Sequence, residues 1–190
     1  MPGFMPGIHV LGIRREEDVD GRDKPGHDIM ANPFTRPAYS AMTTAKPLTY
    51  LFKDDGKVPN NPALPVLVYK GAVDASASAI ETRFSDNGWG NGQWRNGIYQ
   101  FVHYHSMIHE TLGIARGHAR VQLGGHNAEV FELEAGDVVV LPAGTGHQRL
   151  SSSDDLLVIG AYPPDGTYNL CRGDNPADRG RALTTIPKVP

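Results

Sequence analysis

The chain has 190 residues, 39% of them hydrophobic and 21% charged, a balance typical of a globular protein with one domain. Its net charge of −3 without a basic block excludes the usual electrostatic basis for binding nucleic acid or an anionic membrane. A single cysteine, Cys171, excludes an internal disulfide and a multi-cysteine zinc motif, and no apolar run approaches the ~18 residues of a membrane span. We therefore expect a cytoplasmic protein. Its 22 glycines and 15 prolines favour short strands joined by turns over a helix bundle.

Residues 1–47 differ in composition from the rest of the chain. They show no sustained strand or helix periodicity, and the charged stretch 20–28 has almost no apolar surface to bury. We expect a disordered leader here. The tract also resembles sequence translated from too far upstream, so the hypothesis is a native start at Met30 or Met42. Residues 48–190 would then form a single domain.

Three elements are expected at the start of this domain. They are the short strand Thr49–Phe52, the apolar run Leu64–Tyr69 and a helix from Asp74 to Asp86. Either Asp74 or Ser76 can cap the helix, and the Asn-Gly pair after it ends it. The glycine-rich segment 88–94 that follows is interpreted as a loop, in which Trp89 and Trp94 anchor the packing.

Short strand patterns then follow one another closely, separated by turn residues. They cover residues 98–105, 111–115, 119–123, 129–133, 138–141, 147–150 and 156–161. Such a series is typical of a β-sandwich or β-barrel. The tail after Pro163 is rich in glycine and proline, and we expect it to be a loop that ends in a short apolar stretch, residues 183–189.

The arrangement of the histidines indicates a metal site. His103 and His105 are two apart in a predicted strand, so both point to one face, where an ion can lie between them. A third imidazole, His147, follows the turn 142–146, and Glu110 lies beyond a predicted bulge. Neutral imidazoles with one carboxylate suit a divalent transition metal (Fe, Mn, Ni, Co or Zn) better than calcium or magnesium.

The fourth ligand has two candidates. In an unbroken strand His109 would share the face of His103 and His105, and Glu110 would point outward. A bulge at residues 106–108 would re-aim the strand and turn Glu110 inward instead.

Two spaced patterns resemble the conserved motifs of the cupin superfamily. The first is Gly97, five residues, His103-Tyr104-His105, four residues, Glu110, six residues and Gly117. The second is Gly136, five residues, Pro142-Ala143-Gly144, two residues and His147, with Ser151 where asparagine is frequent. The resemblance favours Glu110 over His109 as the fourth ligand.

The sequence around these motifs is similar to that of the bacterial YjlB-like cupins. The similarity runs from about Thr49 to the C-terminus and includes the segments 96–99, 121–125 and 160–163. It implies an all-β fold, a double-stranded β-helix or small jelly-roll barrel, with the short helix before the barrel and the leader outside it. It also implies a homodimer and the metal ligands His103, His105, Glu110 and His147.

Several other side chains have two interpretations. Tyr99, Phe101 and Gln122 either line the pocket or belong to the core. Arg116 shares the parity of Glu110, so it either meets an anionic substrate or forms a salt bridge at the end of the barrel. His118 and His126 are interpreted as surface residues, and Cys171 as an unpaired thiol in a loop.

Two functions compete on this basis. The first is a metal-dependent enzyme, oxidoreductase- or dioxygenase-like by analogy with the superfamily, that acts on a small organic molecule. Its candidate acid–base residues are His109 and Tyr99. The alternative is a non-catalytic cupin that binds a metal or small molecule or acts as a sensor, and a metal-free barrel is a third, weaker reading.

Overall fold

The computed structural model describes residues 46–126 and 128–190, so the predicted leader lies outside the described residues except for its last two. Over the described ranges the strands are β1 (Leu48–Tyr50), β2 (Val66–Tyr69), β3 (Asn91–Asn96), β4 (His103–Tyr104), β5 (Glu110–Arg116), β6 (His118–Leu123), β7 (Glu129–Glu134), β8 (Val138–Leu141), β9 (His147–Ser152), β10 (Leu157–Tyr162) and β11 (Cys171–Arg172). The helices are α1 (Ala77–Asp86), α2 (Pro176–Thr185) and the short 3₁₀ helix η1 (Ile186–Lys188).

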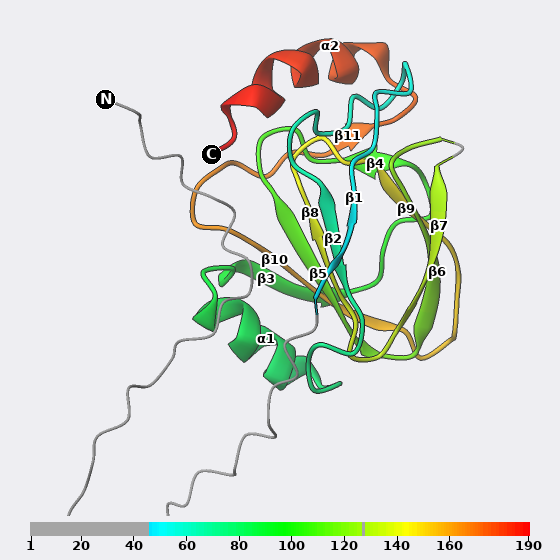
Figure 1. Ribbon diagram of the computed structural model, residues 1–190, viewed down its shortest axis with the longest axis vertical. Helices are drawn as coiled ribbons and strands as arrows, with labels where there is room; N and C mark the ends of the chain where they lie inside the picture. Colours follow the sequence, from blue (N-terminus) through cyan, green and yellow to red (C-terminus); the bar gives the residue numbers. More distant parts are fainter. Residues whose placement is uncertain (1–45, 127) are drawn as a thin grey trace, which may run out of the picture.

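The strands form two antiparallel sheets that face each other as a jelly-roll barrel (Figure 1). One sheet has the order β1-β2-β8-β5-β10-β3, and the other has the order β11-β4-β9-β6-β7. Neighbours in space such as β5 and β10 are far apart in sequence, as the double-stranded β-helix requires. The all-β fold expected from the sequence is therefore confirmed.

Both faces of the six-stranded sheet are covered. The apolar runs of β2 and β8 are buried at every position, which is typical of strands with no solvent face. On the inner face Val68, Leu112 and Val139 pack against residues of the opposite sheet such as Val121. On the outer face the sheet packs against α1. The barrel interior is thus an apolar core at one end, which leaves the other end available for polar side chains.

Helix α1 begins at Ala77, with Ser76 rather than Asp74 as its N-cap. The Ser76 side chain accepts a hydrogen bond from the Ala79 N–H at 3.2 Å, which satisfies one of the free donors of the first turn. Ile80 and Phe84, both fully buried, attach the helix to the sheet. Their close approach requires a glycine beneath them, because a Cβ at Gly113 would lie 2.7 Å from Ile80.

Two expectations about strands were wrong. The segment expected to be a loop with aromatic anchors contains β3, an edge strand paired with β10, whose polar sequence has no apolar alternation. Of the strand expected over 98–105, only β4 pairs in the sheet. Residues 98–102 are not part of a strand. The carbonyls of Ile98 and Tyr99 accept hydrogen bonds from the Nε and the backbone N–H of Arg149, respectively.

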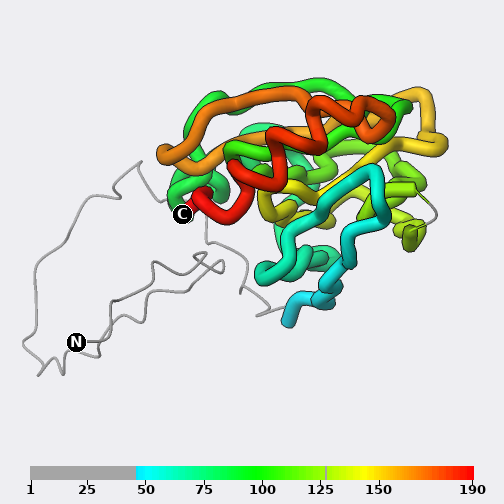
Figure 2. The backbone as a smooth tube through the Cα atoms, turned by 90° about the horizontal axis from the view of Figure 1, so that it is seen from above, coloured from blue at the N-terminus to red at the C-terminus, as the bar shows by residue number. Residues whose placement is uncertain are grey.

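The tail contains a helix where only a loop was expected. The Asn175 side chain accepts from the Ala177 N–H at 3.0 Å, and Pro176 occupies the first turn, where its missing donor costs nothing. Ala182 is fully buried and packs, with Ile186, in a cluster around Tyr104. Figure 2, which looks down on α2, shows the helix lying across one end of the barrel. Within the described part of the chain no helix is long and apolar enough to cross a membrane.

Candidate metal centre

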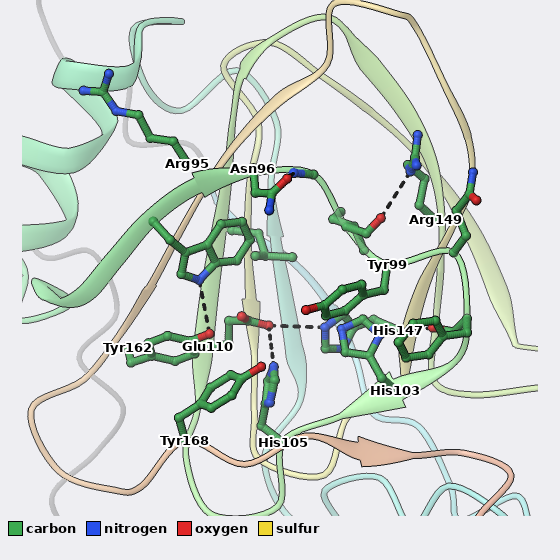
Figure 3. Close-up of a pocket in the computed structure, with 16 residues that line it drawn as sticks. Arg95, Asn96, Tyr99, His103, His105, Glu110, His147, Arg149, Tyr162 and Tyr168 are labelled. Atoms are coloured by element: carbon green, nitrogen blue, oxygen red, sulfur yellow. Dashed lines mark hydrogen bonds and ion pairs between the residues drawn. The ribbon is translucent and has the colours of Figure 1, made fainter.

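Four side chains from both sheets converge inside the barrel (Figure 3). His103 lies on β4 and is the register partner of His147, the first residue of β9, and His105 follows directly after β4. Glu110 begins β5 on the facing sheet. The structure therefore brings together the four residues that the motifs predicted as ligands, between two sheets whose strands hold their backbones in place.

The donor atoms of these side chains are close together and buried. The three imidazoles offer nitrogen atoms that all lie within 4.8 Å of one another. The Oε2 atom of Glu110 lies 3.2 Å from Nε2 of His147 and 3.4 Å from Nε2 of His105. None of the four residues is more than 5% exposed. The histidine triad therefore fits a metal site.

Backbone carbonyls fix the tautomer of each imidazole. The Nδ1 atoms of His103, His105 and His147 lie 3.1, 2.6 and 3.0 Å from the carbonyl oxygens of residues 101, 169 and 145. A carbonyl oxygen only accepts, so each Nδ1 carries the hydrogen and donates it, which leaves Nε2 of a neutral ring as a lone pair. This is the outer hydrogen bond that metal-binding histidines make in proteins.

The resulting set of acceptors needs a positive charge. Oε2 of Glu110 is buried without a hydrogen-bond donor, since the facing Nε2 atoms carry none in neutral rings. Burial and then the His147 ring lower the pKa of His103 to about 2, so this ring stays neutral. Burial alone would lower the pKa of His105, but the Glu110 carboxylate and the Asn169 carbonyl raise it. A proton on His105 or a metal ion between the donors would supply the charge, and the site fits the ion.

The structure separates the two candidates for the fourth ligand. The chain bends at residues 106–108, and Glu110 then shares the inner face of β5 with Leu112. His109 is buried but does not line the cavity. Its Nδ1 accepts from the Ala143 N–H at 2.8 Å, and its Nε2 donates to the carbonyl of Pro190 at 2.9 Å. Both nitrogens of His109 are thus bonded to the backbone, and the structure places this candidate acid–base group outside the cavity.

A cavity of about 700 Å³ opens onto the candidate ligands. This volume lies in the range of small-molecule sites. Much of its wall is aromatic, formed by Trp94, Tyr99, Phe101, Tyr162 and Tyr168. Tyr99 is half exposed, its ring stacks on Phe101 with centroids 4.9 Å apart, and it contacts the His103 ring edge-on at 5.0 Å. The second predicted catalytic candidate therefore does line the cavity beside the triad.

Sequence reasoning missed Tyr162, Tyr168 and Arg149 as cavity residues and assigned Trp94 to packing alone. Trp94 Nε1 donates to the Tyr162 hydroxyl at 3.1 Å. Burial and then the nearby Glu110 carboxylate raise the pKa of Tyr162, so its hydroxyl keeps its proton. Strand alternation could have identified Arg149, because it is two residues after His147 on β9 and therefore points to the same face of the strand. No such signal existed for Tyr168, which reaches the site from an irregular segment.

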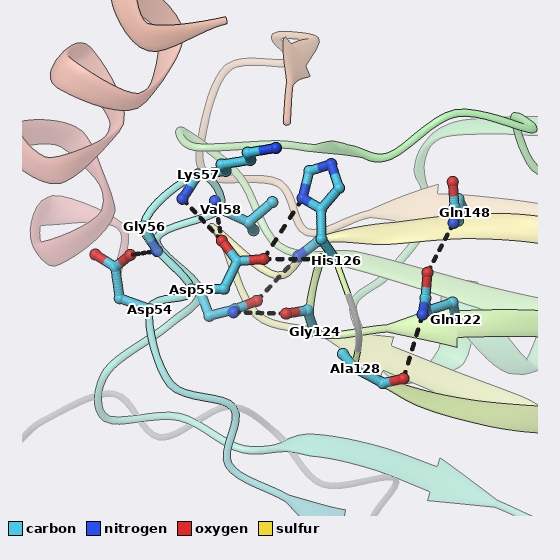
Figure 4. Close-up of polar contacts among 12 residues, drawn as sticks. Asp54, Asp55, Gly56, Lys57, Val58, Gln122, Gly124, His126, Ala128 and Gln148 are labelled. Atoms are coloured by element: carbon cyan, nitrogen blue, oxygen red, sulfur yellow. Dashed lines mark hydrogen bonds and ion pairs between the residues drawn. The ribbon is translucent and has the colours of Figure 1, made fainter. Parts of the chain in front are cut away.

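The remaining ambiguous side chains lie outside the cavity. Arg116 donates to the backbone carbonyl of Asp155 at 3.0 Å and lies 4.0 Å from its carboxylate, which is the salt-bridge alternative. Gln122 donates to the Ala128 carbonyl and accepts from Gln148 (Figure 4), and it is not among the residues that line the cavity.

Residues 52–61 form a strap that contacts the turn before His147, where the Gly146 N–H donates to the Asn60 side chain at 3.1 Å. Within it Asp55 accepts hydrogen bonds from the backbone N–H groups of Lys57 and Val58 at 2.8 and 2.6 Å (Figure 4). Its other oxygen accepts from the His126 N–H at 2.8 Å and lies 3.5 Å from Nδ1 of the same residue. Asp55 thus links the strap to the turn between β6 and β7, and His126 is part of this link rather than a free surface residue.

The strap makes one contribution to stability depend on pH. Burial alone would raise the pKa of Asp55, but the backbone donors and the His126 ring hold it below the usual 3.8. A carboxyl whose pKa is lower in the folded state stabilises above its unfolded pKa and loses this effect as pH falls through the folded value. Asp55→Asn should therefore destabilise the protein by about 1–2 kcal/mol at pH 7. The difference from wild type should shrink as the pH falls below 3.8 and be lost below the lowered pKa of the folded state. Urea unfolding of wild type and variant across this pH range measures the difference in the free energy of unfolding. A difference of the same size at both ends of the pH range would contradict the prediction.

The chain has a relative that covers most of its length. No protein-family model matches it. It is 41% identical over 140 residues to the uncharacterized protein YjlB of Bacillus subtilis (strain 168), which covers 73% of this chain and 82% of that protein. It is also 29% identical over 94 residues to a probable oxalate decarboxylase of Arthroderma benhamiae, covering 45% of this chain but only 23% of that protein.

Two solved structures show weaker likeness. An oxalate decarboxylase variant of Bacillus subtilis is 22% identical with a TM-score of 0.35, over 57% of this chain and 27% of that one. A DUF861 family protein of Thermotoga maritima is 19% identical with a TM-score of 0.30, over 46% of this chain and 93% of that one. Nothing about the reaction follows from these two. On the jelly-roll architecture, the two spaced motifs and the identity to YjlB, the chain belongs to the YjlB-like family of the cupin superfamily.

Proposed function

We propose that the protein is a metal-dependent enzyme that binds one divalent transition ion and acts on a small organic molecule. The observation that carries the proposal is the convergence of three imidazoles whose outer nitrogens are all bonded to backbone carbonyls. This arrangement aims three lone pairs and the Glu110 carboxylate at one point before any ion arrives, so His103, His105, Glu110 and His147 would hold it.

The chain's own side chains would control access to this point. The aromatic wall limits water and offers flat apolar surface to a substrate. Tyr162, which accepts from Trp94, keeps a proton close to Glu110, and half-exposed Tyr99 lines the cavity beside the His103 ring. A bound Fe, Mn, Ni, Co or Zn ion would supply Lewis acidity or a meeting point for dioxygen and substrate. Oxidoreductase- or dioxygenase-like chemistry remains our first choice on superfamily analogy.

Elemental analysis tests this proposal. Protein purified without a metal-affinity tag from metal-supplemented cells should carry close to one equivalent of a divalent transition ion after exhaustive dialysis, because buried preorganised donors release an ion slowly. Redox-active iron or manganese would support oxygen chemistry, whereas zinc would direct the search to isomerase or hydrolytic activity. Protein free of metal after supplementation, which also takes up none from buffer, would overturn the proposal.

One observation favours the alternative, a non-catalytic metal- or ligand-binding cupin. Among the described residues that line the cavity, Glu110 is the only carboxylate, and it belongs to the ligand set. Outside the proposed ligand set, the acid–base groups that line the cavity are tyrosines. Incubating the metal-loaded protein with small-molecule mixtures under air separates the alternatives, because an enzyme consumes a component and a binding protein returns it unchanged. The homodimer and the cytoplasmic location expected from the sequence stay predictions.

A further inference from the structure

The cavity wall contains a cation that no acidic group of the described chain neutralises. Arg149 is partly buried and lines both the metal cavity and an adjacent polar groove of about 600 Å³. Across residues 46–126 and 128–190 no carboxylate lies within ion-pair distance of it. Other arginines do have such a partner; they are Arg95, Arg116, Arg120, Arg172, Arg179 and Arg181. The lack of a counter-charge therefore sets Arg149 apart from these residues.

The hydrogen bonds of Arg149 leave part of its guanidinium free. Nε donates to the Ile98 carbonyl at 3.2 Å, and Nη1 donates to the Ser152 hydroxyl. Both partners are neutral, and Nη2 has no partner within the described residues. A guanidinium carries five N–H donors and stays charged in proteins, so a planar anion is the group that completes it. Burying such a cation without a counter-charge costs free energy, and a bound anion would offset this cost.

The position of Arg149 relates it to the metal candidates. It is two residues after His147 on β9, so both side chains leave the same face of the strand. In Figure 3 the guanidinium is set apart from the imidazoles, with the Tyr99 ring between them in this view. A molecule that spans the two would therefore pass along the ring of Tyr99, which stacks on Phe101.

We propose that Arg149 binds the carboxylate of the substrate, a small monoanionic molecule with a flat apolar body that lies along Tyr99 and Phe101. The proposal rests on the metal-dependent function above and names its substrate class. A carboxylate matches the planar donor fork of arginine with two parallel hydrogen bonds. A phosphate monoester shares the oxyanion chemistry but carries more charge. Among the described residues that line the groove, Arg149 is the only arginine, and Asp154 on the same groove would repel the larger charge of a phosphate more strongly than that of a carboxylate.

Three probes of similar shape test the assignment, namely benzoate, neutral benzamide and phenyl phosphate. Their affinities for the full chain are measured by calorimetry, with and without bound metal. Benzoate should bind more tightly than the other two, and Arg149→Gln should weaken benzoate binding by about tenfold or more while benzamide is unaffected. Arg149→Lys should retain part of the benzoate affinity. Arg120→Gln is the matched control, because this exposed arginine already pairs with Glu132 and should leave every affinity unchanged.

The other outcomes overturn the proposal in distinguishable ways. Two results would limit Arg149 to a structural role in holding the segment 97–102. They are benzamide binding as tightly as benzoate, and an equal loss of affinity for both probes in Arg149→Gln. Tighter binding of phenyl phosphate than of benzoate would contradict the carboxylate as the group that Arg149 binds. No binding of benzoate at millimolar concentrations would contradict the proposed anion site. Metal content is measured on the same samples. Arg149→Gln protein that keeps its metal but loses benzoate affinity supports the proposal, whereas wild-type protein without metal contradicts the metal-dependent function alone.

Discussion

Replacing His105 and His147 together by alanine is expected to abolish stoichiometric metal binding. The change removes two of the four donors, both of which lie within 3.4 Å of the Glu110 carboxylate. His103 and Glu110 remain, and two donors on opposite sheets do not hold a transition ion against dialysis. Elemental analysis of the variant beside wild-type protein, both purified without a metal-affinity tag, measures the loss.

The same variant should also be less stable, by about 3 kcal/mol, because it removes His105, whose proton compensates the charge of the buried Glu110 carboxylate when no ion is bound. Burial alone would raise the pKa of Glu110, but the His105 and His147 rings lower it. Adding Glu110→Gln to the double variant should recover part of the stability and none of the metal. His118→Ala, on an exposed residue, should change neither quantity. Full metal content in the double variant would show that the ion binds elsewhere.

Asn60→Ala is expected to have the second largest effect, although Asn60 does not touch the metal candidates. Its buried side chain donates to the carbonyls of Lys53 and Gly124 at 2.7 and 2.9 Å and accepts from the Gly146 N–H at 3.1 Å. Gly146 directly precedes His147. Alanine would leave these buried groups unpaired and would strain the backbone, whose φ of +51° asparagine tolerates better. We expect a loss of about 3 kcal/mol in the free energy of unfolding.

The loss should also reach the metal site. The turn 142–146 contacts a second predicted ligand, since the Gly144 N–H donates to the His105 carbonyl at 2.7 Å. Loosening the turn should therefore lower metal affinity about 10–100-fold, the range found for groups that orient ligands. Asn60→Gly removes the same hydrogen bonds without the backbone strain, so the difference between the two variants isolates the strain. A variant that is destabilised but binds metal as tightly as wild type would limit Asn60 to a folding role.

The jelly-roll fold was implied by the resemblance to the cupin motifs. By itself, the sequence determined the series of short strands and the spacing of the metal candidates. Both depend on local rules. Strands alternate their side chains, so residues two apart such as His103 and His105 share a face, and regularly spaced turn residues delimit the strands around them. The helix α1 was predictable for the same reason, because its cap and its apolar face lie within a few residues of one another.

Only the tertiary structure decided which groups meet at the site. Periodicity left His109 and Glu110 as alternatives, and they are separated by contacts with Ala143 and Pro190, which are distant in sequence. The polar strand β3 takes its conformation from pairing with β10, where a Cβ at Gly160 would lie 2.0 Å from the Trp94 ring. Arg149 stands out because, among the described residues of the folded chain, no carboxylate lies within ion-pair distance of it. Parity is a property of one strand, whereas pairing, counter-charges and cavity walls depend on segments that the chain brings together from far apart.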